Sequence, residues 1–392
     1  MRLLVSADIH LGSPIRSIAL RNPDLGDRLK QASRDAFTKI VDLAISERVD
    51  ALVLAGDIFD DRHPDLKSRA FLIAQLSRAA QNNVPTVLIR GNHDALLDHS
   101  AHGDLGPGIH LLHKGAPSVE IGDTVFHGLS FDARHVTTSF LPDYPRPVPG
   151  KRNVGLMHTS LDGASGHDPY APCSERDLMA HGFDLWCLGH IHAPFERADG
   201  PVLAIMPGIP QPRHFGERQG GSVVLVSLGD GLPAFERHPV GQLGFCESAV
   251  DLTECTDQQQ VLRNLHDALV SAQVPGRDMA VRLHATSDRY SAEIITELAA
   301  EVLDGMDGVF LDKVKAAPPP RALGQVTDDL VRLMQAELTE DGFRQAAMDQ
   351  LAELRLALPS EIRDELDEQA LDALLQEAIA EVSLTLHAGA VQ

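Results

Sequence analysis

Cysteine, long apolar runs and positive charge are all scarce in this chain. Its four cysteines show no close paired spacing; they are Cys173, Cys187, Cys246 and Cys255. This spacing argues against a disulfide framework or a zinc ribbon and indicates a reducing compartment. No apolar run approaches the length of a membrane helix, and Asp8 interrupts the first one too early for a signal peptide. We therefore expect a cytoplasmic protein.

The shortage of positive charge is uneven along the chain. The formal net charge is −22, whereas proteins that bind nucleic acids usually present a basic face. Residues 1–240 hold 23 Lys and Arg against 28 Asp and Glu, a net −5, so the remaining residues carry −17. The acidity is therefore mostly C-terminal.

Five short polar clusters each follow an apolar run that is typical of a buried strand. The clusters are Asp8-Ile9-His10, Gly56-Asp57, Gly91-Asn92-His93-Asp94, His158 and Gly189-His190-Ile191-His192. Side chains placed where strands end in loops can converge on one site. Taken singly, each Asp is more often a helix cap or loop residue, and each His an ordinary partly buried side chain. Their joint recurrence at predicted strand ends favours a metal site.

The residue types indicate which metals this site would hold. Carboxylates mixed with imidazoles and an amide suit manganese first, with iron or zinc as alternatives, whereas an all-oxygen set would suit magnesium or calcium. Asp57 is the natural ligand to share between two ions, because its short side chain directly follows a glycine. Two ions about 3.5–4 Å apart can activate a water between them and clamp a phosphate ester.

The clusters resemble the calcineurin-like metallophosphoesterase superfamily. Three stretches are most similar to SbcD-type DNA repair exonucleases: Ser6–Gly12, Gly56–Asp60 and Leu188–His192. Two longer stretches narrow the resemblance to the YhaO-like branch: Gly155–Ser160 running into His167–Cys173, and Met206–Glu217. The resemblance is strong over residues 1–240 and loose beyond them. It implies a two-sheet α/β sandwich with flanking helices.

The resemblance also implies a role for each cluster. The implied ligands are Asp8, His10, Asp57 and His192 for the first ion, and Asp57, Asn92, His158 and His190 for the second. His93 matches the family's catalytic histidine, which is not a ligand and stabilises the transition state or protonates the leaving oxygen. Asp94 would either orient the His93 imidazole or cap a loop.

Two further pairs of residues lie close to these motifs in the sequence. Asp60 and Asp61 follow the shared ligand, and we interpret them as the start of a solvated loop rather than as part of the site. Arg213 and His214 lie in the last family stretch. Arg213 is equally suited to bidentate phosphate contact and to a surface ion pair.

The chain is long enough for two or three domains. Residues 1–240 would form the nuclease domain, with helices over 29–47 and 66–82 and an irregular proline-rich segment over 141–150. Residues 245–316 read as strands over 247–252, 279–284 and 309–314 and helices over 258–271 and 292–303. This small α+β module resembles the family's capping domain, although it could also be a separate folding unit without a part in catalysis.

A stiff proline-rich linker over 316–321 precedes a helical region within 322–392. This region would be either a packed helical tail or a docking element, since the resemblance implies an SMC-like ATPase of the SbcC type as partner. The resemblance also leaves a homodimer open.

The predicted function is that of a metal-dependent DNA exonuclease acting in DNA repair, with 3′-to-5′ polarity on duplex ends implied by the resemblance. DNA contact would use the metals and local basic residues such as Arg146, Lys151 and Arg152. A phosphomonoesterase or small-nucleotide phosphodiesterase of the same superfamily is the nearest alternative. A non-enzymatic scaffold is the alternative from another class, and the intact ligand set argues against it.

Overall fold

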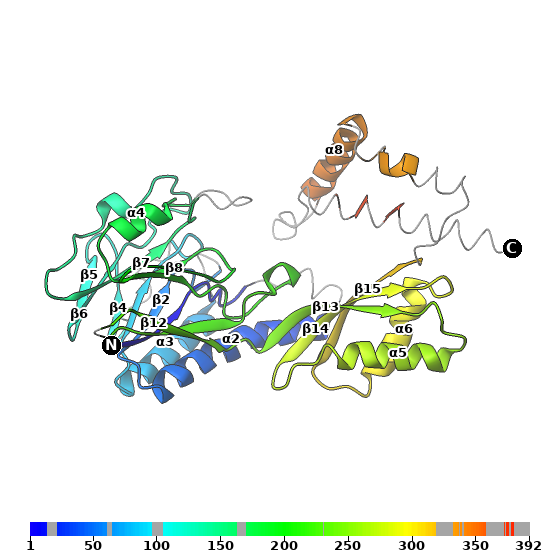
Figure 1. Ribbon diagram of the computed structural model, residues 1–392, viewed down its shortest axis with the longest axis horizontal. Helices are drawn as coiled ribbons and strands as arrows, with labels where there is room; N and C mark the ends of the chain where they lie inside the picture. Colours follow the sequence, from blue (N-terminus) through cyan, green and yellow to red (C-terminus); the bar gives the residue numbers. More distant parts are fainter. Residues whose placement is uncertain are drawn as a thin grey trace. The chain divides into compact units, whose positions relative to one another are not determined.

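The computed structural model of the chain divides into two compact units, which are described separately (Figure 1). The structure describes residues 1–13, 22–60, 65–95, 105–162, 170–229, 231–318, 332–336, 338, 341–357, 372, 374–375 and 378–379. The first unit comprises residues 1–14 and 28–244, and the second comprises residues 15–27 and 245–392. None of the described helices is long and apolar enough to cross a membrane.

The first unit is built on two six-stranded sheets, which confirms the predicted α/β sandwich. The first sheet has the order β12 (Ala234–Pro239), β11 (Ser222–Ser227), β1 (Arg2–Ser6), β2 (Ala51–Ala55), β3 (Thr86–Ile89) and β4 (Ile109–Leu111). Strands β1 to β4 run parallel, whereas β11 pairs antiparallel with β1 and with β12.

The second sheet has a parallel centre with an antiparallel strand at each edge. Its order is β5 (Ser118–Ile121), β6 (Thr124–Gly128), β7 (Arg152–His158), β8 (Leu185–Gly189), β10 (Val202–Met206) and β9 (Phe195–Asp199). Strands β6, β7, β8 and β10 run parallel, and β5 and β9 pair antiparallel at the edges.

The alternation of side chains along each strand explains the layers. Leu3 and Val5 belong to the core between the sheets, whereas Leu4 lies in the core beneath α2 (Pro23–Ser46) and α3 (Leu66–Gln81). Because these strands are buried on both faces, they read as continuous apolar runs rather than alternating ones. Figure 1 shows α2 and α3 covering one side of the sandwich and α4 (Glu175–Ala180) the other.

Local signals fix where the short elements begin. The Asp65 carboxylate accepts from the Ser68 amide and caps α3, and the Ser174 hydroxyl caps α4 in the same way. The proline-rich segment contains a short 3₁₀ turn, η2 (Leu141–Asp143), where we predicted only irregular chain. A second 3₁₀ turn, η3 (Phe215–Glu217), precedes β11.

The second unit contains a three-stranded sheet with two helices, in the predicted order. The strands are β13 (Leu243–Asp251), β14 (Asp278–Thr286) and β15 (Val309–Ala317), and the helices are α5 (Gln258–Val270) and α6 (Ala292–Leu303). One apolar core joins the helices to one face of the sheet. Farther along, the structure describes α8 (Asp341–Ala357), whereas residues 319–331 and most of 358–392 lie outside the described part.

Candidate metal centre

The five polar clusters lie at the carboxyl ends of parallel strands from both sheets. Strands β1, β2 and β3 lead to the first three clusters, and β7 and β8 lead to the other two. Four of the candidate ligands have left-handed backbones, with φ of 53° at Asp8, 50° at His10, 50° at Asp57 and 101° at His190. Such backbones in residues other than glycine concentrate where function requires them.

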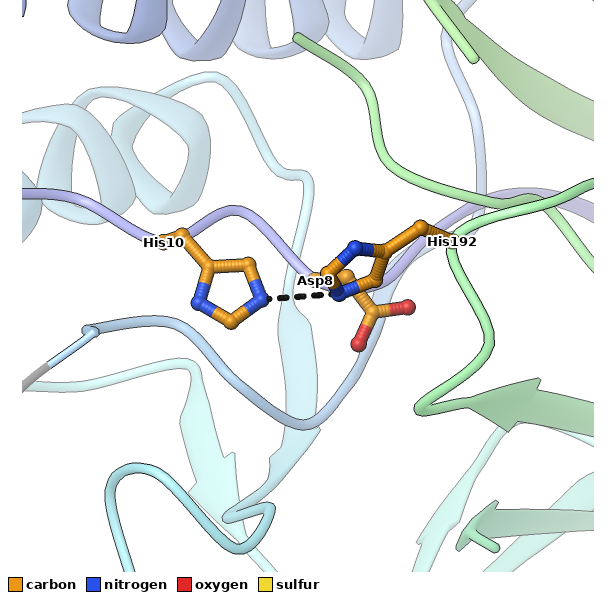
Figure 2. Close-up of side chains that lie close together, drawn as sticks. All are labelled: Asp8, His10 and His192. Carbon is orange, nitrogen blue, oxygen red and sulfur yellow. Dashed lines mark hydrogen bonds between the residues drawn. The ribbon is translucent and has the colours of Figure 1, made fainter. Parts of the chain in front are cut away.

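Asp8, His10 and His192 form the first group. One ligand atom from each lies within 4.8 Å of the others. Figure 2 shows their side chains converging, and the Nε2 atoms of His10 and His192 are 3.2 Å apart. The Asp8 carboxylate also accepts from the main-chain N–H of His190, at 3.0 and 3.2 Å.

Asn92 and His158 form the centre of the second group. Asn92 Oδ1 lies 2.9 Å from His158 Nε2. The other ring nitrogen, His158 Nδ1, lies 3.1 Å from the carbonyl oxygen of Ala55. Because a carbonyl can only accept, Nδ1 donates to it and fixes the ring orientation. The His190 ring packs edge-on against the His158 ring, with 5.2 Å between centroids.

Asp57 lies between the two groups. Its Oδ2 atom is 3.8 Å from His10 Nε2 and 3.4 Å from His158 Nε2. Its Oδ1 atom accepts from the main-chain N–H of His93 at 3.0 Å, which orients the carboxylate. One oxygen of Asp57 is therefore directed at a histidine of each group, as a shared ligand requires.

These groups satisfy one another poorly without a cation. His10, Asp57 and His158 are buried, and Asp57 Oδ2 faces the Nε2 atoms of both histidines at 3.8 and 3.4 Å. Buried acceptors at such distances need a shared proton or a metal ion between them. The donor set of carboxylate, imidazole and amide oxygens therefore fits a divalent ion.

Without a metal ion, a proton compensates the buried negative charge of this cluster. Burial disfavours the charged imidazole of His158, but the carboxylates of Asp57 and Asp8 raise its pKa to about 9. Burial alone would raise the pKa of Asp57, but the imidazoles of His158 and His10 hold it well below its usual range. A proton on His158 therefore balances the Asp57 charge where a cation would otherwise do so.

Burial is the largest influence on the pKa of Asp8 and of His10. It raises the pKa of Asp8 to about 6 and lowers the pKa of His10 to about 4, to which Arg213 contributes. Both groups therefore lose part of their charge in the dry interior. A bound cation would favour the ionised form of Asp8, whereas burial already keeps His10 in the neutral form that binds metal.

His93 differs from the ligands in its exposure. Its side chain is 41% exposed, whereas those of His10 and His158 are buried. Its Nδ1 lies 3.1 Å from the carbonyl oxygen of Asp60. The ring is thus held at one nitrogen at the solvent side of the ligands, and its centroid is 4.9 Å from that of His10.

The described hydrogen bonds of Asp94 match the loop cap, one of the two roles that the sequence left open, and none of them is to His93. Its Oδ2 accepts from the Ile58 amide at 2.9 Å, and its Oδ1 accepts from the Gly91 amide at 2.7 Å. The carboxylate therefore ties together the loops after β2 and β3, which carry Asp57 and Asn92. Burial and the nearby Asp57 raise the pKa of Asp94 to about 6.

Asp60 is part of the site, although the sequence favoured a solvated loop. Its side chain is 14% exposed, and Oδ1 lies 2.8 Å from His10 Nδ1. Its position next to the shared ligand was the available signal. Asp61, His167 and Asp168 lie outside the described residues.

Arg213 forms ion pairs with two carboxylates inside the site rather than on the surface. Its side chain is 16% exposed and donates to Asp60 at 3.1 Å and to Glu217 at 2.9 Å. Glu217, which the sequence analysis did not single out, lies 2.7 Å from His192 Nδ1. It is the last residue of a stretch that carries the family resemblance, which was the only signal for it. His214 remains largely exposed beside Glu217.

Comparison with known proteins agrees with this geometry. Residues 1–194 match the family model described as calcineurin-like phosphoesterase. The uncharacterized metallophosphoesterase YhaO of Bacillus subtilis is 29% identical over 284 residues, which cover 71% of this chain and 70% of YhaO.

Two archaeal relatives are described as DNA double-strand break repair protein Mre11. The one from Sulfolobus acidocaldarius is 26% identical over 222 residues and is matched over 54% of each chain. The one from Methanosarcina mazei is 25% identical over 347 residues, which cover 83% of this chain and 54% of the relative. The chain thus spans about half the length of these two relatives.

Proposed function

Residues 1–194 form a calcineurin-like phosphoesterase domain, and on that premise we propose that the chain is a metal-dependent exonuclease that hydrolyses the phosphodiester bonds of DNA. Membership of this family makes the chain a metal-dependent phosphoesterase. The proposal adds DNA as substrate, two ions, 3′-to-5′ action on duplex ends and a role in DNA repair.

The position of Asp57 carries the two-ion part of the proposal. One of its carboxylate oxygens lies between His10 Nε2, at 3.8 Å, and His158 Nε2, at 3.4 Å. A carboxylate shared in this way would hold two ions close together. Asp8, His10 and His192 would complete one site, and Asn92, His158 and His190 the other. The mixed donor set favours manganese, with iron or zinc as alternatives.

Two divalent ions in these sites would supply Lewis acidity and positive charge beside a phosphodiester. The protein contributes the fixed geometry. The Asp57 carboxylate is oriented by the His93 amide, and the Asp8 carboxylate is oriented by the His190 amide. Both orienting donors belong to the main chain, so ligand positions depend on the loops and not on mobile side chains.

His93 is the proposed acid or electrostatic catalyst. The Asp60 carbonyl holds its Nδ1, which leaves Nε2 to exchange a proton with a leaving oxygen or to stabilise developing charge. Its 41% exposure, against 26% for His192, allows contact with a substrate.

The names of the archaeal relatives support DNA as the substrate. The basic patch named from the sequence adds little positive charge near the metals. Arg152 and His158 are the first and last residues of β7. At about 3.3 Å per residue, the strand separates them by about 20 Å. Lys151 also pairs with Glu120 at 2.8 Å. This patch would contact a phosphate several nucleotides from the scissile bond.

The second unit and the C-terminal region would act outside the hydrolysis step. Residues 245–316 would act as a cap that helps select the DNA end. The helical region within 322–392 would bind an SMC-like ATPase. Both assignments rest on the family resemblance.

The test uses the purified chain with manganese, end-labelled duplex and single-stranded DNA, and a bis-nitrophenyl phosphodiester. We expect the wild-type protein to shorten DNA and the His93→Ala variant to leave it intact. A ladder that shortens only from the 3′ end would support the polarity. Cleavage of the small diester without DNA cleavage would favour a small-nucleotide phosphodiesterase, and absence of any hydrolysis would favour a scaffold.

A further inference from the structure

A serine, a histidine and an asparagine outside the metal centre form a hydrogen-bonded chain on the second sheet. His127 Nδ1 lies 2.8 Å from Ser118 Oγ, and His127 Nε2 lies 3.1 Å from Asn153 Oδ1. His127 and Asn153 are only 1% and 4% exposed, whereas Ser118 is an exposed residue of the edge strand β5. The chain of contacts therefore leads from the interior to an exposed serine.

The pairing of β5 with β6 brings the serine and the histidine together. Ser118 lies directly opposite His127 in this antiparallel pair. The neighbouring pair is hydrogen-bonded, because the Gly128 amide donates to the Pro117 carbonyl at 2.9 Å. Pairs of the two kinds alternate, so Ser118 and His127 form a pair without main-chain hydrogen bonds, in which the side chains lie closer. The Ser118 N–H consequently points outward from the edge of the sheet.

Asn153 determines which nitrogen of His127 carries the proton. Its Nδ2 donates to the carbonyls of Val148 and Lys151, at 3.2 and 3.0 Å. Its Oδ1 accepts from the Val148 amide at 2.7 Å and is also the atom that faces His127. Because an amide oxygen only accepts, Nε2 of His127 donates to it. Nδ1 is then the acceptor, and the Ser118 hydroxyl donates to it.

His127 is held in its neutral form. Burial lowers the pKa of His127 and His181 acts in the same direction, whereas the hydrogen bond to Asn153 opposes both. The Phe183 ring stacks on the imidazole, with 4.6 Å between centroids and 15° between planes. The imidazole therefore keeps a lone pair directed at a serine hydroxyl, which is the arrangement of a general base beside a nucleophile.

We propose that Ser118 is a nucleophile that accepts acyl groups from small carboxylic esters without a metal ion, with His127 as its general base and Asn153 as a positioning residue. This activity is separate from the proposed phosphodiester hydrolysis, since it uses none of the candidate metal ligands.

The acyl transfer follows from the positions of these groups. The Oγ–H proton passes to His127 Nδ1 as Oγ bonds to the carbonyl carbon, and the carbonyl oxygen becomes an oxyanion. The outward N–H of Ser118 donates to that oxyanion, as the amide of the nucleophile does in serine hydrolases. The ester C–O bond then breaks, and the leaving alkoxide takes the proton from Nδ1. Water attacks the acyl-serine by the same steps and releases the acid.

Covalent labelling of the full chain in a chelator tests this inference. A fluorophosphonate transfers a phosphonyl group to activated serines with loss of fluoride, and peptide mass spectrometry locates the adduct. We expect an adduct on Ser118 and none on Ser227. Ser227 is the matched comparison, because it is also exposed on a strand but lies opposite Arg2 and Ala234 rather than a histidine.

Two variants separate the nucleophile from the base. Ser118→Ala should remove the adduct, and His127→Gln should slow labelling by at least about 100-fold, the smaller contribution usual for a general base. Both should lose hydrolysis of 4-nitrophenyl acetate in the chelator. Ser118→Ala should leave metal-dependent cleavage of the bis-nitrophenyl diester unchanged, so the outcome does not depend on the metal centre.

Asn153→Ala distinguishes a positioning role from a purely structural one. The labelling rate should rise with pH as His127 loses its proton. Because the hydrogen bond to Asn153 raises the pKa of His127, its removal should move the midpoint of this profile to lower pH and also slow labelling. A purely structural residue would lower the melting temperature and leave the midpoint in place.

His127→Gln could unfold the protein, since His127 is buried, so a variant that keeps His127 completes the test. Ser118→Cys places a thiol beside the same Nδ1, and its reaction with iodoacetamide should be at least about tenfold faster than that of Ser227→Cys. Three results would overturn the inference: no adduct on Ser118 in the wild type, labelling of folded His127→Gln at the wild-type rate, or equal alkylation of the two introduced thiols.

Discussion

The α-carbon of Gly91 lies directly against the carboxylate of Asp57. A Cβ added to Gly91 would come within 2.1 Å of Asp57 Oδ1 and 2.8 Å of its Cγ, far inside van der Waals contact. Gly91 also donates its amide to Asp94. The loop after β3 therefore passes so close to the shared ligand that only a residue without a side chain fits.

Gly91→Ala should consequently displace Asp57 and reduce the rate of metal-dependent hydrolysis by at least about 100-fold, because a displacement of about 1 Å at a catalytic centre has that effect. The measurement is bis-nitrophenyl phosphate hydrolysis with Mn²⁺, together with the number of bound ions. Gly231→Ala is the control, since nothing lies within 4 Å of a Cβ there. Activity near the wild-type value in Gly91→Ala would contradict the assigned role of Asp57.

The sequence predicted the strands and the position of the polar clusters at their ends because both signals are local. Each ligand cluster directly follows an apolar run, so a strand and its cluster appear together in a short stretch of sequence. In the structure, Asp8 of the first cluster and His192 of the last cluster lie in one group. Parallel strands make this convergence predictable, since their carboxyl ends share an edge.

The supporting contacts could not be predicted in this way. Glu217 is identified by its distance from His192, and Asp60 by its distances from His10 and from Arg213, which is 153 residues away in sequence. The position of Asp60 next to the shared ligand was a signal, but it does not distinguish a buried carboxylate from a solvated one. The partners of Asp94 were equally unpredictable, because its carboxylate accepts from main-chain amides rather than from the neighbouring imidazole.

His93→Ala should keep both metal sites and reduce turnover by about 10²–10⁴-fold, the usual contribution of a general acid or base. The side chain is 41% exposed and its hydrogen bond is to the Asp60 carbonyl, so metal affinity and stability should stay near the wild-type values. Steady-state kinetics and Mn²⁺ titration measure the two properties separately. His266→Ala, at an exposed position on α5, is the control. A parallel loss of metal binding would make His93 a ligand instead.

Asp94→Ala should destabilise the fold and weaken metal binding together. The carboxylate accepts from the amides of Ile58 and Gly91, and its loss would leave two buried donors unsatisfied, at a cost of about 1–3 kcal/mol each. Urea unfolding and Mn²⁺ titration should both change. A variant with normal stability and metal affinity but reduced turnover would restore the orienting role that the sequence suggested.

Metal removal should lower the melting temperature. Asp8 and Asp57 are buried carboxylates, and an ion that binds only the folded state stabilises it by about 2.7 kcal/mol at 100 times its Kd. Thermal unfolding with Mn²⁺ and with a chelator measures the difference. Asp57→Asn should lose most of this stabilisation. Identical melting curves of the wild type with and without millimolar Mn²⁺ would argue against a metal centre.

Removing the residues after 322 should abolish association with an SMC-like ATPase and leave hydrolysis of the small diester unchanged. All candidate site residues precede residue 218 and lie in the first unit, so the site does not depend on the removed segment. Within that segment, Leu333 and Phe343 are 65% and 39% exposed, which leaves apolar surface on helical stretches for a partner.

Co-purification of the tagged chain with the ATPase measures the association. Leu333→Lys combined with Phe343→Lys is a finer variant, because it removes apolar surface without shortening the chain, and it should weaken the complex. The truncated chain must still cleave bis-nitrophenyl phosphate at the wild-type rate, so that loss of association is not confused with misfolding. Full association of the truncated chain would exclude docking through this segment and would direct the search for the ATPase contact to residues 1–322.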